Sequence, residues 1–289
     1  MNFKLGIGLI CLSFTFSNVW ASKVDTVVTH SQAMKKDIKA VVITPEKYDK
    51  AKQYPVVYLL HGYSGSYKDW PKAAAVLAAA DLYNEIIVCG DGGFGSWYWD
   101  SPVDPAFKYE TYVSKELVEW VDKNYTTIKS SKGRAIAGLS MGGHGALYLA
   151  IKHPNVFGAC GSMSGGVDIR PFPDNWDMAK RMGKYSEHPE RWEKNTIVNM
   201  LHLIEPKTLS IIIDCGTGDF FMKLIRPYTN SCYIETYHTI ILPGREDIHG
   251  LTGKMQSAIN CFFLQFLFQI QLRFTTVLIF NNLIYHKFQ

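Results

Sequence analysis

The sequence predicts an α/β protein built on a doubly wound, mostly parallel sheet, and three observations carry this prediction. Short apolar runs alternate along the chain with segments of helical character, as in a parallel sheet with helices on its faces. One of these runs leads through a glycine-rich turn directly into a helix. The chain has 289 residues, of which 47% are hydrophobic, so it can bury one large core. The sequence contains no repeats and indicates no second domain.

The expected elements follow one another in a regular order. Alternating residues indicate an opening hairpin at 24–43, and continuous apolar runs indicate buried strands at 54–60, 85–89, 134–137, 157–163 and 209–214. The expected helices are 69–80, 111–125 and 146–151. The second of these is amphipathic, with Leu117, Val118 and Val121 on one face. The segment 170–194 is rich in proline, tryptophan and charge, and we expect it to form a cap or lid insertion.

The most informative stretch is Gly138-Leu139-Ser140-Met141-Gly142, a G-x-S-x-G sequence between a short apolar strand and a helix. A turn this sharp strains the serine backbone and needs small neighbours, which Gly138 and Gly142 supply. It lifts the Ser140 hydroxyl above the sheet and points the helix N-terminus at a developing oxyanion. A glycine-rich turn that merely contains a serine is the alternative. The flanking strand and helix favour the nucleophile elbow of an α/β-hydrolase fold, with Ser140 as nucleophile.

A serine nucleophile needs a histidine base that a carboxylate orients, in the chain order nucleophile, acid, histidine. Asp214 and Asp219 both occur at the end of the last predicted strand, where catalytic groups gather. Asp214 closes the strand, and a turn or cap role is its better interpretation. Asp219 follows a glycine-containing loop and can turn back toward Ser140. We therefore predict Asp219 as the catalytic acid.

His61-Gly62-Tyr63 ends the strand at 54–60, where this fold places the loop that completes an oxyanion hole. The predicted donors are the backbone N–H groups of Tyr63 and Met141. We interpret His61 as structural rather than catalytic. His144, one turn into the elbow helix, is interpreted as a residue of the helix face.

An aromatic loop, Trp97-Tyr98-Trp99-Asp100, follows the strand at 85–89. Two interpretations remain open for it. Trp97 and Trp99 either pack in the core or form a wall of the substrate pocket against the acyl or alcohol group.

Charge and composition narrow the function classes and the location. A net charge of +4 is too small to imply nucleic-acid binding. Residues 1–21 combine Lys4, an apolar run at 5–16 and small residues near Ala21, as in a cleaved secretory signal, and the run is too short to span a membrane. We therefore expect export to the periplasm or beyond. The cysteines have no metal-ligand spacing, so we expect buried free thiols, no metal and no cofactor.

Four motifs of the chain are long and specific: 58–63, 96–102, 138–145, and 214–217 followed by 219–221. They resemble the putative-esterase family of α/β-hydrolases, which contains esterase D (S-formylglutathione hydrolase), feruloyl and acetylxylan esterases, and mycolyltransferases. The resemblance runs from about residue 24 to Phe221 and is closest to exported Bacteroidetes-type members. It implies a serine carboxylesterase with Ser140 as nucleophile and Asp219 as acid. The family often has a second aspartate where Gly218 stands.

After Phe221 the resemblance stops. The family continues with an amphipathic helix, a glycine-rich turn carrying His-Thr-Trp and a last helix, whereas 222–289 is irregular and apolar. Codons can be chosen for 247–250 so that a shifted frame spells His-Thr-Trp, and the same shift from Met222 onward restores the expected helices. We therefore predict a frameshift near Phe221, in the gene or in its reading. We therefore expect three parts in the chain: a signal peptide at 1–21, an esterase domain at 22–221, and an aberrant tail at 222–289 that replaces the last helices and the histidine loop.

The tail leaves the catalytic base in doubt. His249 lies close to where the family's histidine falls, but its flanking sequence is foreign, so it is a doubtful base. His238 is a weaker candidate. A serine hydrolase without its histidine keeps only the rate that binding and the oxyanion hole provide.

These observations support hypotheses from different classes. The first is an exported serine carboxylesterase that hydrolyses a small acyl or aryl ester, such as a feruloyl or acetyl ester on polysaccharide, through an acyl-serine intermediate. The second is a catalytically inactive hydrolase-fold product that at most binds ligand. An S-formylglutathione hydrolase-like thioesterase is a further alternative, and a peptidase is disfavoured because no large accessory domain is present. The expected partner is a small-molecule or polysaccharide-linked ester, with neither nucleic acid nor a membrane span.

Overall fold

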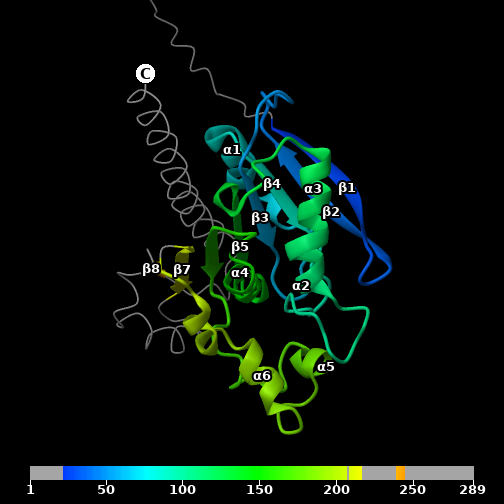
Figure 1. Cartoon of the computed structure of the whole chain (residues 1–289), viewed down its shortest axis with the longest axis vertical. Coiled ribbons are helices and arrows are strands. Elements are labelled where there is room, and N and C mark those ends of the chain that lie inside the picture. The colour runs from blue at the N-terminus through cyan, green and yellow to red at the C-terminus, as the bar shows by residue number, and fades with distance from the viewer. Residues whose placement is uncertain (1–21, 207, 217–238, 245–289) are drawn as a thin grey trace, which may run out of the picture.

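The computed structural model describes residues 22–206, 208–216 and 239–244. Within these residues an eight-stranded sheet forms the centre, in the order β1-β2-β4-β3-β5-β6-β7-β8 (Figure 1). The strands are β1 Lys23–Ser31, β2 Lys36–Thr44, β3 Val56–Leu60, β4 Ile86–Gly90, β5 Arg134–Leu139, β6 Ala159–Met163, β7 Ser210–Gly216 and β8 Thr239–Gly244. The expected signal at 1–21 and most of the expected tail lie outside the described residues.

The strand directions confirm the predicted sheet. β1 and β2 form the expected antiparallel hairpin, and β2 pairs antiparallel with β4. All further neighbours, from β4 through β3, β5, β6 and β7 to β8, are parallel. In this register Tyr58 of β3 lies opposite Val88 of β4 and Ile136 of β5. The carboxyl ends of the parallel strands therefore meet at one edge of the sheet.

Helices cover both faces of the sheet. Successive strand residues point to opposite faces, so strands buried on both sides are apolar throughout. Val57 and Ile87 pack with α1 on one face, and Tyr58 and Val88 pack with α3 and α4 on the other. The helices are α1 Ala74–Tyr83, α2 Tyr109–Thr111, α3 Leu117–Asn124, α4 Met141–Lys152, α5 Met178–Met182 and α6 Pro189–Asn195. Cys89, Cys160 and Cys215 are buried free thiols, as predicted.

The expected helix at 111–125 is interrupted. It consists of α2, a π-helical turn at Tyr112–Glu116, and α3. The carboxylate of Glu116 accepts hydrogen bonds from the Ser31 hydroxyl at 2.6 Å and the Ala33 N–H at 2.9 Å. The hydroxyls of Tyr112 and Thr29 lie 2.7 Å apart. The π turn therefore binds the opening hairpin with side chains, which local periodicity did not indicate.

Two more elements differ from expectation. The helix at 69–80 is a 3₁₀ turn, Trp70–Lys72, followed by α1, because Ala73 between them is extended. Thr239–Gly244, within the segment expected to be an aberrant tail, forms β8 beside β7. The sequence Ile240-Ile241-Leu242 favours extended backbone, and strand β7 provides the parallel neighbour with which it pairs.

The segment 170–194 forms the expected insertion, with α5 and α6 at the end of the molecule opposite α1 (Figure 1). Arg181 of α5 attaches it to the loop after β4. Its guanidinium donates to the Gly95 carbonyl at 3.2 Å and to the Asp104 carboxylate at 3.1 Å, and it lies 3.4 Å from the centroid of the Phe107 ring. Among the described residues no helix is long and apolar enough to cross a membrane.

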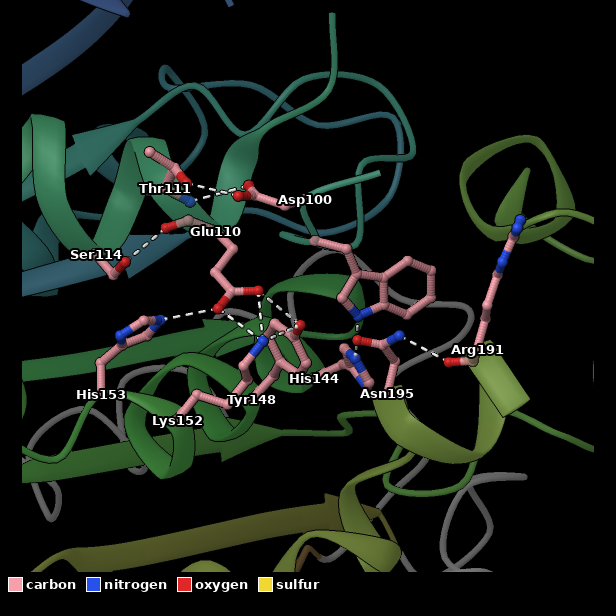
Figure 2. A network of polar contacts seen from close by, with 11 residues as sticks. Asp100, Glu110, Thr111, Ser114, His144, Tyr148, Lys152, His153, Arg191 and Asn195 are labelled. Carbon is pink, nitrogen blue, oxygen red and sulfur yellow. Dashed lines mark hydrogen bonds and ion pairs between the residues drawn. The ribbon is translucent and has the colours of Figure 1, made fainter. Parts of the chain in front are cut away.

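A polar cluster fastens α2 to the last turns of α4 (Figure 2). The carboxylate of Glu110 binds the Tyr148 hydroxyl at 2.7 Å, the Lys152 ammonium at 2.7 Å and the His153 ring nitrogen Nε2 at 3.0 Å. Burial raises the pKa of Glu110, but the hydrogen bonds from His153, Lys152 and Tyr148 outweigh it and bring the pKa to about 2. The ionised carboxylate thus stabilises the position of α4.

We expect this cluster to make stability depend on pH. Because the pKa of Glu110 in the folded chain lies below its usual 4.5, its contribution is complete above pH 4.5 and disappears as pH falls toward 2. Glu110→Gln should lower the free energy of unfolding at pH 7 by about 2–3 kcal/mol and flatten its pH dependence in that range. Urea titrations at several pH values measure both. The control is Glu187→Gln, which changes an exposed carboxylate paired with Lys184. Parallel pH curves for the parent and Glu110→Gln would contradict the prediction.

Candidate active site

Ser140 occupies the sharp turn between β5 and α4. Its backbone has φ 56° and ψ −115°, a conformation that L residues adopt only under strain. Ser140 is partly exposed, whereas Met141 behind it is fully buried. The Ser140 N–H donates to the Met163 carbonyl of β6 at 2.8 Å, and the Ser140 carbonyl accepts from His144 N–H at 3.0 Å. This is the geometry of a nucleophile elbow, as the sequence predicted.

Two glycines make the turn possible. A Cβ at Gly138 would overlap the backbone of Gly142, and a Cβ at Gly142 would overlap the Leu60 carbonyl and lie 2.7 Å from the His61 carbonyl. The start of α4 therefore packs backbone to backbone against the end of β3. No side chain fits into this contact.

The loop after β3 lies directly beside the nucleophile. A Cβ built on Gly62 would lie 3.6 Å from the Ser140 Cβ. Of the predicted oxyanion donors, the Tyr63 N–H thus follows a residue that lies beside Ser140, and the Met141 N–H follows Ser140 in the chain. The indole N–H of Trp70 donates to the Leu60 carbonyl at 3.0 Å and holds the strand end.

His61 is structural in this arrangement. Its Nε2 accepts the Gly92 N–H at 2.8 Å, so Nε2 carries no proton and Nδ1 must donate to the Gly62 carbonyl, also at 2.8 Å. Both ring nitrogens are occupied and the side chain is buried. His61 therefore has no nitrogen free to take a proton from Ser140.

His144 belongs to α4, as expected, but it is completely buried. Its Nε2 accepts the indole N–H of Trp99 at 3.0 Å, so Nδ1 donates to the Gly166 carbonyl at 2.7 Å. Burial lowers the pKa of His144 to about 4, although the bond to Gly166 acts in the opposite direction. The ring is neutral at neutral pH and fixes the aromatic loop to the elbow helix.

The structure favours the packing interpretation of the aromatic loop over a pocket wall. Trp97 and Trp99 are each 1% exposed and stack on one another with ring centroids 5.6 Å apart. The Trp97 indole N–H donates to the Trp176 carbonyl at 3.0 Å, and the Trp99 indole N–H is taken up by His144. Neither ring offers a surface to substrate, because both are enclosed by these partners.

Other aromatic side chains, more exposed to solvent, lie at the loop 61–63, which carries the predicted donor Tyr63 and which we call the oxyanion loop. The Tyr63 ring packs against Phe94 with centroids 4.8 Å apart, and Phe94 is 55% exposed. The Tyr63 hydroxyl donates to the Asp177 carboxylate of the insertion at 3.2 Å. Sequence reasoning missed this contact. Phe94 stands three residues before Trp97, but its exposure cannot be deduced from its position in the sequence.

The remaining predicted triad members are only partly placed. Asp214 lies within β7, which continues to Gly216, so it does not close the strand as expected. Burial raises the pKa of Asp214 to about 6, against a backbone hydrogen bond from Cys215 that lowers it. Asp219 and His249 lie outside the described residues, as does His238. The described residues contain no cluster of metal-binding side chains.

Comparison with known proteins fits this geometry. The protein-family model described as "Putative esterase" matches residues 31–236. An acetyl esterase of Caldicellulosiruptor saccharolyticus is 30% identical over 221 residues, which cover 70% of this chain and 82% of the relative. A ferulic acid esterase of known structure superposes with a TM-score of 0.70 at 25% identity, covering 87% of this chain and 99% of that one.

Other relatives match over shorter stretches. An esterase of Mycobacterium tuberculosis is 37% identical over 136 residues, which cover 45% of this chain and only 29% of the relative. The chain therefore spans less than a third of that longer protein. The structure of an S-formylglutathione hydrolase from Agrobacterium tumefaciens shares the fold, with a TM-score of 0.71 at 20% identity over 88% of this chain and 96% of that one. With its family-model match over most of the chain and its nucleophile elbow, this chain belongs to the putative-esterase family of α/β-hydrolases.

Proposed function

We propose that this protein is a serine carboxylesterase that hydrolyses small acyl or aryl esters through an acyl-Ser140 intermediate. The observation that carries the proposal is the strained, partly exposed Ser140, at φ 56°, beside the Gly62 loop. Strained backbone at a strand end persists only where the surrounding structure holds it, and such sites concentrate at reactive residues.

The proposed reaction follows from the groups around Ser140. Its hydroxyl oxygen attacks the ester carbonyl carbon and gives its proton to a histidine base, so that a tetrahedral oxyanion forms. The N–H groups of Met141 and Tyr63, together with the N-terminal end of α4, stabilise the negative charge. The alcohol then leaves with that proton, and water releases the acid from the serine. Asp219 is the proposed acid and His249 the doubtful in-frame base.

The relatives support the substrate class. The acetyl esterase of Caldicellulosiruptor saccharolyticus is named for a small acyl group. An endo-1,4-beta-xylanase/feruloyl esterase of Xylanibacter ruminicola, 32% identical over 126 residues, is named for an aryl ester and for a polysaccharide. We therefore propose small acyl or aryl esters, free or linked to polysaccharide, as substrates.

Replacing the nucleophile tests the proposal directly. In a version with the frame restored after Phe221, Ser140→Ala should lower kcat for p-nitrophenyl acetate by about 10⁴-fold or more, because no acyl-enzyme can form. The matched control is Ser162→Ala on β6, since the Ser162 hydroxyl is buried without a hydrogen-bond partner in the described part of the chain. Ser162→Ala should retain the parental kcat. Near-parental turnover by Ser140→Ala would refute the mechanism.

A second pair of variants decides between the two aspartates. Asp219→Asn should lower kcat by about 10⁴-fold, because the histidine loses its orienting carboxylate. Asp214→Asn should leave kcat within about tenfold of the parent, since Asp214 is a half-buried residue within strand β7. Steady-state kinetics of the frame-restored protein at pH 7.5 measure both. A larger loss for Asp214→Asn would reverse the assignment.

We also propose the frameshift near Phe221, on the sequence alone. Expression of the chain as given, beside a version with the shifted frame restored after Phe221, tests it. The restored version should be soluble and hydrolyse the ester, whereas the chain as given should aggregate, because the missing helices expose apolar sheet surface. Soluble protein with equal turnover from both versions would contradict the frameshift and make His249 the base.

A further inference from the structure

We propose that Tyr98 is a positioning residue that, together with His61, fixes the orientation of two successive peptides in the loop at 61–63, including the peptide that carries the predicted oxyanion donor, the Tyr63 N–H. This inference rests on the proposed esterase function, because it explains how the hole for the oxyanion is kept formed in the free enzyme. No part of it requires a group outside the described residues.

The first peptide joins His61 to Gly62. The Tyr98 hydroxyl donates to the His61 carbonyl at 3.0 Å, and the Tyr98 ring meets the His61 ring edge-on with centroids 6.1 Å apart. Burial raises the pKa of Tyr98 well above its usual value, so the hydroxyl remains a donor. In a planar trans peptide the N–H points away from the carbonyl, so fixing the His61 carbonyl also fixes the Gly62 N–H.

The second peptide joins Gly62 to Tyr63. Its carbonyl accepts His61 Nδ1–H at 2.8 Å and the Gly65 N–H at 3.0 Å. His61 is itself oriented by the Gly92 N–H on Nε2. By the same planarity the Tyr63 N–H must point in the opposite direction. The His61 ring therefore orients the peptide that carries the Tyr63 N–H, the predicted oxyanion donor.

Two glycines far apart in the sequence leave the space that the Tyr98 ring occupies. A Cβ at Gly92 or at Gly145 would overlap the Tyr98 ring, so the ring fills the gap between the loop after β4 and helix α4. Tyr98 has φ 61° and Trp97 has φ 55°, both in the left-handed region that L residues adopt only at a cost in free energy. The Ser96 hydroxyl accepts the Tyr98 N–H at 3.0 Å and supports the turn. Two successive strained residues hold one fully buried ring against the oxyanion loop.

Tyr98→Phe tests the proposal because it removes only the hydroxyl. In the full-length version with the frame restored after Phe221, we expect kcat for p-nitrophenyl acetate to fall about tenfold, with KM changed less than twofold, since the oxyanion forms only after substrate is bound. Hydrogen exchange followed by mass spectrometry should show faster exchange in a peptide covering 60–66. The matched control is Tyr112→Phe, which removes a buried hydroxyl bonded to Thr29 on the hairpin. It should lower the melting temperature comparably and leave both kcat and exchange at 60–66 unchanged.

The outcomes separate this inference from the proposed function. Unchanged kcat and unchanged exchange at 60–66 in a folded Tyr98→Phe protein would overturn the inference. An equal fall of kcat in Tyr98→Phe and Tyr112→Phe would also overturn it, because a general loss of stability would then explain the effect. If the frame-restored parent hydrolyses no ester, the proposed function fails. Hydrogen exchange still decides whether Tyr98 holds the loop, with faster exchange at 60–66 in support and unchanged exchange against.

Discussion

The structure depends on one steric constraint, the backbone contact between the end of β3 and the start of α4. Gly142 lies so close to the carbonyls of Leu60 and His61 that any side chain would collide with them, and Gly138 lies equally close to Gly142. This contact fixes where α4 begins relative to the sheet. It also fixes the distance between Ser140 and the loop at Gly62. The oxyanion site is thus a consequence of main-chain packing, with side chains needed only to set the direction of its peptides.

Backbone strain is concentrated around that contact. Among the described non-glycine residues, Lys35 and Asn84 have positive φ in a hairpin turn and at a helix end, where such angles are common. The others lie in the loops that follow the strands or in the insertion: Ser64, Trp97, Tyr98, Ser140, Ser164, Trp176 and Asp177. Each costs free energy that the large apolar core on both sides of the sheet must offset. Trp97 donates to the carbonyl of Trp176, and Asp177 accepts a hydrogen bond from Tyr63. The insertion is therefore joined to the aromatic loop through strained residues on both sides, and to Tyr63 through the strained Asp177.

Most of the sheet was predictable because its signals are local. Continuous apolar runs located the parallel strands, and the G-x-S-x-G turn located Ser140 and its helix. The π turn at Tyr112–Glu116 was not predictable, because its cause is a set of contacts with the distant Thr29, Ser31 and Ala33. The role of Trp97 and Trp99 stayed open for the same reason. Whether an aromatic ring faces substrate or core depends on partners such as His144 and Trp176, which stand far away in the sequence.

Charge inside the described core is kept low around the nucleophile. His61 and His144 each accept an N–H on Nε2 and donate from Nδ1. Burial lowers the pKa of His144 to about 4, so that ring is neutral at neutral pH, and a neutral interior makes dipoles from backbone N–H groups more effective at the oxyanion. A base that accepts the Ser140 proton must become positively charged, and it therefore needs a more solvated position and an ionised carboxylate nearby. Burial raises the pKa of Asp214 to about 6, so it loses its charge at a higher pH than an exposed carboxylate does. In the proposed mechanism the packed sheet supplies the nucleophile and the oxyanion donors, and we expect the acid and the base to come from the sequence after β7.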